Sequence, residues 1–86
     1  MKIRRKSAFD RAYRKLTKEQ RLSVDTTLRT FAENPHNLRL HNHKLSGVHE
    51  GIRSIRAEYD LRILYVELNG HAVVLLITVG KHDEVY

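Results

Sequence analysis

The chain has 86 residues, of which 41% are hydrophobic and 30% charged, and its formal net charge is +6. This length allows one domain with a single hydrophobic core. The chain has no cysteine, no signal-peptide pattern and no apolar run near the roughly 20 residues that span a bilayer, which excludes disulfides, thiolate metal sites and a membrane span, so we expect a cytoplasmic protein.

The N-terminal segment is strongly basic, with eight Lys or Arg residues in positions 1–18 against Asp10 alone. Such clustering suits a polyanionic partner, although a solvated helix face gives the same pattern. Residues 1–6 are predicted to form a short edge strand around Ile3. Ser7 is a candidate N-cap for a helix over residues 8–16, whose apolar stripe consists of Phe9, Ala12, Tyr13 and Leu16.

A second, longer helix is predicted from Thr17 to about Ala32. Thr17 and Gln20 have the spacing of a capping box at its start. The Asn34-Pro35 pair ends it, because the residue before proline is disfavoured in helical conformation. The two helices form a helical hairpin that must bury its apolar side against a sheet. The expected inner face of the second helix consists of Val24, Leu28, Phe31 and Ala32.

Residues 36–50 are predicted to be a loop with a short strand near 38–41. The loop is rich in histidine, and His41, His43 and His49, with His82, are candidate metal ligands. That signal is weak, since no cysteine accompanies them and the spacing fits no tight motif, so no metal site is predicted. Residues 51–59 are expected to form a strand with Ser54 and Arg56 on one side.

The chain is organised around a predicted β-hairpin of residues 61–68 and 71–79, separated by Asn69-Gly70, the dipeptide typical of a two-residue type I′ turn. That turn places Leu64 opposite Leu75 and position 60 opposite 79. Both faces of the hairpin are apolar, so it should be central in the sheet. The predicted fold is therefore one α+β domain over residues 1–86: an N-terminal strand, a two-helix hairpin, and a three-stranded antiparallel meander that completes one sheet.

Chemically active side chains gather at the far end of this hairpin. In the predicted register, Asp60 and the 80–82 segment are neighbours, so His82 comes close to the Asp60 carboxylate. A set of imidazole, carboxylate, guanidinium and phenol groups suits RNA cleavage by the ribose 2′-hydroxyl, which needs a base, an acid and a cation at the phosphate. Its candidate members are His43, Lys44, Arg56, Asp60, Arg62, His82 and Tyr86. The alternative is a surface salt-bridge network of Asp60 with Arg62 or Arg56, and of His82 with Asp83.

Three segments resemble the RelE/ParE superfamily of toxins from bacterial toxin–antitoxin pairs, most closely its RelE and YafQ branches. They are His43-Lys-Leu-Ser-Gly47, residues 56–65 with Asp60-Leu-Arg-Ile-Leu-Tyr65, and Val79-Gly-Lys-His-Asp-Glu-Val-Tyr86. The resemblance covers nearly the whole chain, because the predicted order of elements also matches, and it implies a RelE-like fold. The C-terminal hairpin and its tail are the most specific part.

The resemblance also implies a function: a toxin that enters the ribosomal A site and cuts mRNA by 2′-hydroxyl attack. YafQ-like toxins match at His43, Asp60, His82 and Tyr86, and RelE-like toxins match at Arg62 and Tyr86. The chain departs from YafQ at Arg56, where a second active histidine is typical, and at Leu61, where a tryptophan often occurs. It departs from RelE at His82, where an arginine is expected.

The resulting interpretation is a metal-independent endoribonuclease without a cofactor, whose partners are a cognate antitoxin, the ribosome and mRNA. His82 is the expected general acid, and Asp60 or His43 the general base. A ParE-like poison of DNA gyrase and a catalytically silent partner-binding protein are the alternatives, although ParE-like relatives generally lack the histidine and terminal-tyrosine set. The catalytic residues are predicted to be His43, Asp60, Arg62, His82 and Tyr86, and the RNA- or phosphate-binding residues Lys44, Arg56, Lys81, Arg11, Arg14 and Lys15.

Overall fold

A computed structural model describes residues 1–86. It confirms the predicted α+β order of one strand, two helices and a meander, and it adds a two-residue strand and a C-terminal helical turn. Two 3-10 turns, η1 (Leu38–Leu40) and η2 (Gly47–His49), lie on either side of the added strand. The other elements are β1 (Lys2–Arg5), α1 (Ser7–Arg14), α2 (Lys18–Glu33), β2 (His43–Lys44), β3 (Arg53–Glu58), β4 (Leu61–Glu67), β5 (Val73–Gly80) and α3 (His82–Val85).

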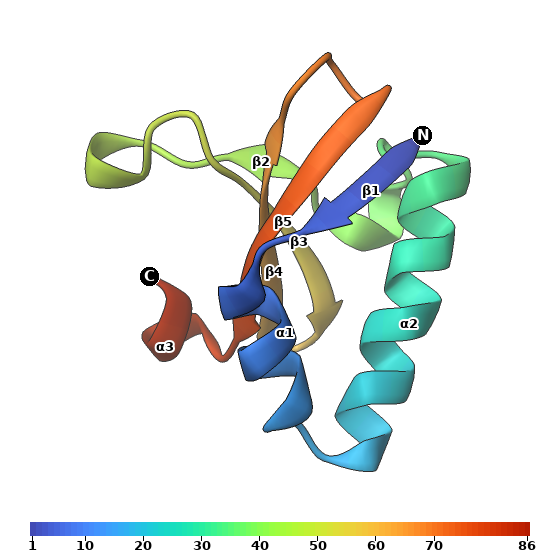
Figure 1. Cartoon of the computed structure of the whole chain (residues 1–86), viewed down its shortest axis with the longest axis vertical. Coiled ribbons are helices and arrows are strands. Elements are labelled where there is room, and N and C mark those ends of the chain that lie inside the picture. The colour runs from blue at the N-terminus through green and yellow to red at the C-terminus, as the bar shows by residue number, and fades with distance from the viewer.

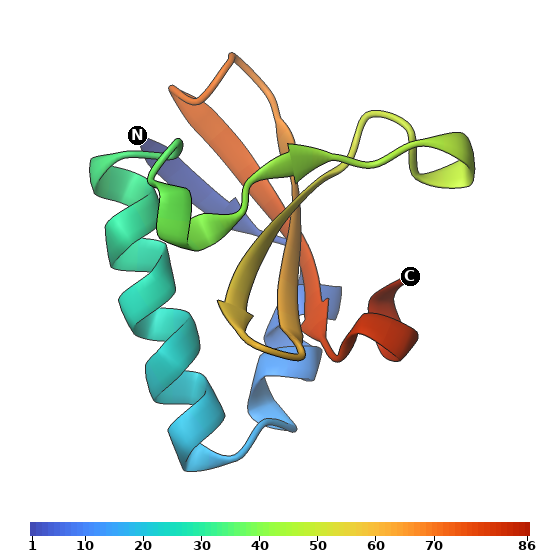
Figure 2. The ribbon, with the colours of Figure 1, turned by 180° about the vertical axis from the view of Figure 1, so that it is seen from behind.

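The strands form one mixed five-stranded sheet in the order β1-β5-β4-β3-β2. The β1 strand pairs in parallel with β5, and every other pair is antiparallel. The predicted hairpin, β4 and β5, is therefore central, and β1 lies at an edge as expected. Figures 1 and 2 show α2 on one side of the sheet and α3 on the other. No helix is long and apolar enough to cross a membrane.

The hydrophobic core lies between the sheet and the two long helices. Alternate residues of each strand face it, as the period of two requires. Tyr13 of α1 donates a hydrogen bond to Asp25 of α2 at 2.8 Å, which ties the two helices together over this core. The core cluster consists of Phe9, Val24, Phe31, Leu40, Ile55, Leu61, Ile63, Tyr65, Val74, Leu76 and Val79.

The local signals in the helices are mostly confirmed. The capping box of α2 is present, since Gln20 N donates to the Thr17 side chain at 3.1 Å and Thr17 N donates to the Gln20 side chain at 2.9 Å. Two details were wrong. Ser7 is the first residue of α1 and not its cap, because the chain turns into the helix at Lys6. Ala32 is exposed, because it lies about 100° around α2 from Phe31 and outside the narrow buried strip.

The predicted register of the central hairpin was also wrong. Glu67 pairs with Val74, so the connection is a loop over residues 68–72 and not a two-residue turn at Asn69-Gly70. A β-bulge then shifts the register again, and Leu64 pairs with Thr78 where Leu75 was expected. Position 60 consequently has no partner at 79, which pairs with Ile63. The bulge inserts an extra residue into β5, and the strand bends there, near its C-terminal end.

The strand predicted near residues 38–41 is absent. That segment is the 3-10 turn η1, and the short strand β2 follows it at His43–Lys44. Between them, His41 has a positive φ of 49°, in the left-handed region, so the chain turns sharply before it joins the sheet. This turn, and not a continuous strand, presents residues 41–43 to the sheet.

One face of the sheet carries no long helix, and we call it the open face. It includes apolar side chains of β4 and β5 that are only half-buried: Val66, Val73, Leu75 and Ile77. The turn α3 and the loop that contains η2 project on the same side of the sheet (Figures 1 and 2). The open face is thus a partly apolar floor between two projecting segments.

Candidate functional site

The β-register brings three of the candidate polar residues onto the open face, together with Ser54. His43 pairs with Ser54, and Arg56 pairs with Arg62. Directly opposite residues of neighbouring strands share a face, and residues two apart on one strand do as well. Strands β2, β3 and β4 therefore present His43, Ser54, Arg56 and Arg62 on one side, away from the two long helices.

The three candidates, His43, Arg56 and Arg62, line a shallow depression of about 410 Å³ together with His41 and Asn42. Nη2 of Arg56 lies 2.6 Å from Nε2 of His41. Nδ1 of His43 lies 2.7 Å from the backbone carbonyl oxygen of His41. The His43 imidazole and the two guanidiniums of the predicted set thus converge at this depression, where His41 joins them.

Arg56 and Arg62 are an unusual pair, because like charges directly opposite in a sheet are destabilising. Neither guanidinium takes part in any of the four ion pairs of the structure. Nη1 of Arg62 donates to the carbonyl oxygens of Glu58 and Tyr59, at 3.0 and 2.8 Å, and this fixes the side chain over the β3–β4 turn. Two positive charges without a carboxylate partner leave this depression electrostatically suited to an anion.

The C-terminal turn lies beside the same face, and the predicted proximity of Asp60 to residue 82 is confirmed. The Asp60 carboxylate accepts a hydrogen bond from the backbone N of His82 at 3.2 Å, so Asp60 anchors the start of α3. The hydroxyl of Tyr86 donates to Oγ of Ser54, which is fully buried in β3. The His82 ring lies edge-on to the Tyr86 ring, 4.4 Å between centroids.

Asp60 and His82 are therefore neighbours, but the carboxylate contacts the backbone of His82 and not its imidazole. The Nδ1 atom of His82 lies 3.7 Å from the Asp83 carboxylate, which is the ion pair considered in the alternative interpretation. The other part of that alternative is absent, because Asp60 forms no ion pair with Arg56 or Arg62.

The predicted RNA-binding lysines and arginines outside the depression do not form one surface. Arg11, Lys15 and Lys81 line a groove of about 380 Å³ between α1 and the C-terminal turn. Arg14 lines a different groove together with Asp10 and Asp25, which oppose its charge. Lys44 pairs with Arg53 and lines a third hollow beside the loop of η2.

The histidines considered as metal ligands do not form a metal centre. Nε2 of His41 contacts Arg56, and Nδ1 of His43 contacts a backbone carbonyl. No group of three or more histidine, aspartate or glutamate side chains has a geometry that could hold a metal ion.

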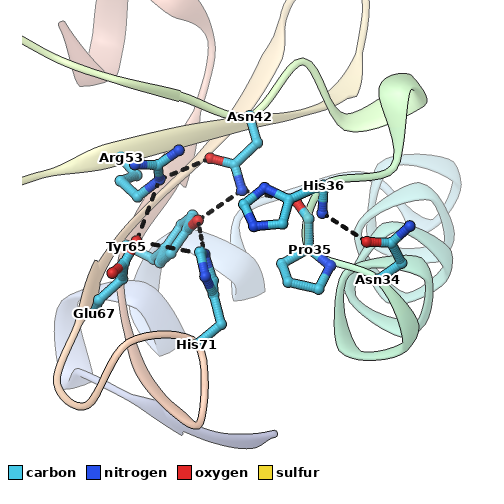
Figure 3. Close-up of polar contacts among 8 residues, drawn as sticks. All are labelled: Asn34, Pro35, His36, Asn42, Arg53, Tyr65, Glu67 and His71. Atoms are coloured by element: carbon cyan, nitrogen blue, oxygen red, sulfur yellow. Dashed lines mark hydrogen bonds and ion pairs between the residues drawn. The ribbon is translucent and has the colours of Figure 1, made fainter.

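A second polar cluster, which the sequence did not indicate, holds the loop before β2 in place (Figure 3). Nδ2 of Asn42 donates to the Pro35 carbonyl oxygen at 2.8 Å and to the Tyr65 hydroxyl at 2.7 Å. Nε of Arg53 donates to Oδ1 of Asn42 at 2.9 Å. The Tyr65 hydroxyl in turn contacts Nε2 of His71 at 2.8 Å. Because Asn42 lies between His41 and His43, this cluster fixes the segment that lines the depression.

The pKa changes of Tyr65 and His71 favour the hydrogen bond between them. Burial raises the pKa of the Tyr65 hydroxyl, so it keeps its proton and can donate. Burial lowers the pKa of His71 below its usual value, although the Glu67 carboxylate, 3.5 Å away, opposes this. A neutral His71 has a ring nitrogen that can accept a hydrogen bond from the Tyr65 hydroxyl. The hydrogen bond is therefore consistent with the directions of both pKa changes.

We expect this cluster to lose stability in mild acid. The folded-state pKa of His71 is lowered from 6.5, so the unfolded chain binds its proton more readily. The contribution of His71 to the unfolding free energy is therefore fully present above about pH 6.5, and it declines as the pH falls below that value. Urea unfolding at pH 7.5 and pH 5.5 should show a loss of unfolding free energy that is smaller in His71→Gln. His49→Gln, on the turn η2 and outside this cluster, is the control and should keep the wild-type difference, and an equal loss in all three proteins would contradict the assignment to His71.

Comparisons with known proteins identify the fold. No protein-family model and no curated protein sequence matches this chain. Among solved structures, YafQ from Escherichia coli strain BL21(DE3) is similar over 98% of this chain and 96% of its own, with a TM-score of 0.82 and 15% identity. A YoeB/ParE toxin from Agrobacterium tumefaciens covers 95% of this chain and 99% of its own, with a TM-score of 0.78 and 16% identity.

The toxin–antitoxin complex RelBE2 from Mycobacterium tuberculosis contains a chain that matches 94% of this one, over 96% of its own length, with a TM-score of 0.77 and 22% identity. The predicted RelE-like fold is confirmed by these similarities. At identities of 15% to 22%, these similarities show the fold alone.

Proposed function

We propose that this chain is the toxin of a type II toxin–antitoxin pair and an endoribonuclease that cuts mRNA on the ribosome by attack of the ribose 2′-hydroxyl. The strongest support is the Arg56–Arg62 pair, two opposed guanidiniums that no carboxylate neutralises. They lie beside the His43 imidazole in one depression. Sequences that break a local rule of stability tend to do so at functional sites. A phosphodiester is the anion that this combination of cations and a proton-transfer group would recognise.

Each step of the cleavage has a candidate group, either in the depression or on the C-terminal turn. A base removes the 2′-hydroxyl proton, for which we favour the imidazole of His43 over Asp60, because the Asp60 carboxylate already accepts the His82 backbone N–H. Arg56 and Arg62 stabilise the additional negative charge of the crowded phosphate. His82 donates a proton to the departing 5′-oxygen, and the Tyr86 ring stacks on a base. Imidazoles exchange protons near neutral pH, so this scheme needs no metal ion or cofactor.

An antitoxin partner is part of the proposal. The half-buried apolar floor of the open face offers a surface that a partner chain can cover, and its charged surroundings suit an acidic or amphipathic segment. The RelBE2 chain of similar fold was solved in complex with an antitoxin. Arg11, Lys15 and Lys81 would contact ribosomal RNA through phosphates, in a salt-dependent and largely sequence-independent way. Action on translating ribosomes places the chain in the cytoplasm.

A translation extract tests the proposal directly. Purified protein is added to a translating message, and primer extension maps any cuts. We expect cuts at fixed positions within codons that disappear when translation is blocked. Cuts that persist on the naked message would contradict ribosome dependence, and the absence of cuts would contradict the nuclease. Inhibition of DNA supercoiling by gyrase, without cuts in RNA, would support the ParE-like alternative instead.

The Arg56–Arg62 pair predicts opposite effects on activity and stability. Arg56→Gln should lower the cleavage rate about 10²- to 10³-fold, because one preorganised donor to the phosphate is lost. The same change should leave the unfolding free energy unchanged or raise it by about 0.2–1 kcal/mol, since the opposed like charges are relieved. Cleavage assays and urea denaturation of the same preparation measure both effects. Arg29→Gln, on the exposed side of α2, is the matched control and should alter neither quantity.

A further inference from the structure

The backbone conformation of His41 directs its carbonyl oxygen toward His43. Its φ of 49° is uncommon for a residue with a side chain. In this conformation its carbonyl oxygen lies 2.7 Å from Nδ1 of His43. A carbonyl oxygen can only accept a hydrogen bond, so Nδ1 of His43 must carry the proton. The neutral His43 ring therefore has its free electron pair on Nε2, the atom that remains available to take a proton.

The imidazole of His41 acts on a different neighbour. Its Nε2 lies 2.6 Å from Nη2 of Arg56. A guanidinium is always protonated and can only donate, so Nε2 of His41 must be the acceptor and this ring must be neutral. The charged groups that face His41 are the guanidiniums of Arg56 and Arg62, with His43 beside them. A protonated His41 would add a third cation there and lose its bond to Arg56.

We propose that His41 is a positioning residue of this site, which sets the tautomer of His43 through its backbone carbonyl and holds the Arg56 guanidinium through its imidazole. This rests on the proposed function, since it assigns a role within the same cleavage reaction. His41 does not itself exchange a proton with the RNA. The two roles are separable, because one belongs to the backbone and the other to the side chain.

Two substitutions separate these roles in the translation extract. His41→Gly keeps the left-handed backbone and the carbonyl but removes the imidazole. We expect it to lower the cleavage rate about 10- to 100-fold, the effect of losing one hydrogen bond to a charged group. His41→Gln restores an acceptor for Arg56 and should recover most of the wild-type rate. Wild-type cleavage by the glycine variant would overturn the side-chain role, as would a folded glutamine variant no faster than glycine.

Nuclear magnetic resonance of the ¹⁵N-labelled imidazoles tests the geometry without any cleavage. At neutral pH, the wild type and His41→Gly should both show His43 protonated on Nδ1, the tautomer that free histidine disfavours. Protonation on Nε2 in the wild type would overturn the backbone role, whether or not any variant folds. A wild-type chain that shows Nδ1 protonation but cuts no message would overturn the proposed function and leave the His41 geometry established.

Discussion

Replacing His43 by alanine should abolish most of the cleavage activity, with a fall in rate of about 10²- to 10⁴-fold, the usual contribution of a positioned acid–base group. His43 is exposed on β2, and its Nδ1 is held by the His41 carbonyl while its ring lines the depression. The fold should be unaffected, because the His43 side chain is exposed on an edge strand and is not part of the core cluster. The expected result is therefore a loss of cleavage at constant unfolding free energy.

The measurement for His43→Ala is the rate of message cleavage in the translation extract, together with urea denaturation of the same preparation. His49→Gln is the matched control, since it also removes an imidazole from the loop beside β2 but lies outside the depression. It should retain the wild-type rate. An equal loss in both variants would point to a general effect of the loop on binding, and full activity of His43→Ala would exclude His43 as the base.

Parts of the fold could be predicted because a local signal determined the structure there. The capping box of Thr17 and Gln20 and the end of α2 at Asn34 depend on residues within one helical turn, and both are confirmed. The central position of the hairpin followed from apolar residues on both of its faces. Such signals depend on neighbours in the sequence, so the sequence alone is enough to find them.

The hairpin register depended on a contact far from the turn, and this is why it was missed. Asn69-Gly70 favours a tight turn, and Gly70 does adopt a positive φ of 53°. However, His71 lies in the loop between the two strands, and its ring packs against Tyr65 and Phe31, with centroids 5.9 Å from each. Residues 68–72 therefore form a longer loop. The tertiary contact of one imidazole prevails over the preference of the dipeptide.

The candidate site divides in the same way. That Asp60 and residue 82 are neighbours could be predicted, because the ends of the hairpin and of the preceding strand meet at one end of the sheet. The direction of the His82 imidazole could not, since the chain turns into α3 immediately before it. The role of His41 could not be predicted either, because a positive φ at a histidine leaves no mark in the sequence. The assignment of His43, Asp60, Arg62, His82 and Tyr86 as catalytic residues stays a prediction.

Phe31→Ala should produce the largest loss of stability in the chain, about 3–5 kcal/mol of unfolding free energy, because it leaves a cavity at the centre of the core. Phe31 is fully buried, and its ring lies edge-on to Tyr65 with centroids 4.8 Å apart. For a small domain with about 5–15 kcal/mol in total, this loss is a large fraction.

The loss should also reach the candidate site. Phe31 supports Tyr65, whose hydroxyl holds Asn42, so the segment that carries His41 and His43 should loosen before the sheet unfolds. Urea denaturation measures the global loss, and amide hydrogen exchange at residues 41–43 measures the local one. Leu22→Ala, which shortens a side chain on the same helix that is 55% exposed, is the control and should change stability by no more than about 0.5 kcal/mol. If Phe31→Ala lowers stability while exchange at residues 41–43 stays at the wild-type rate, the packing of α2 stabilises the fold without positioning the site.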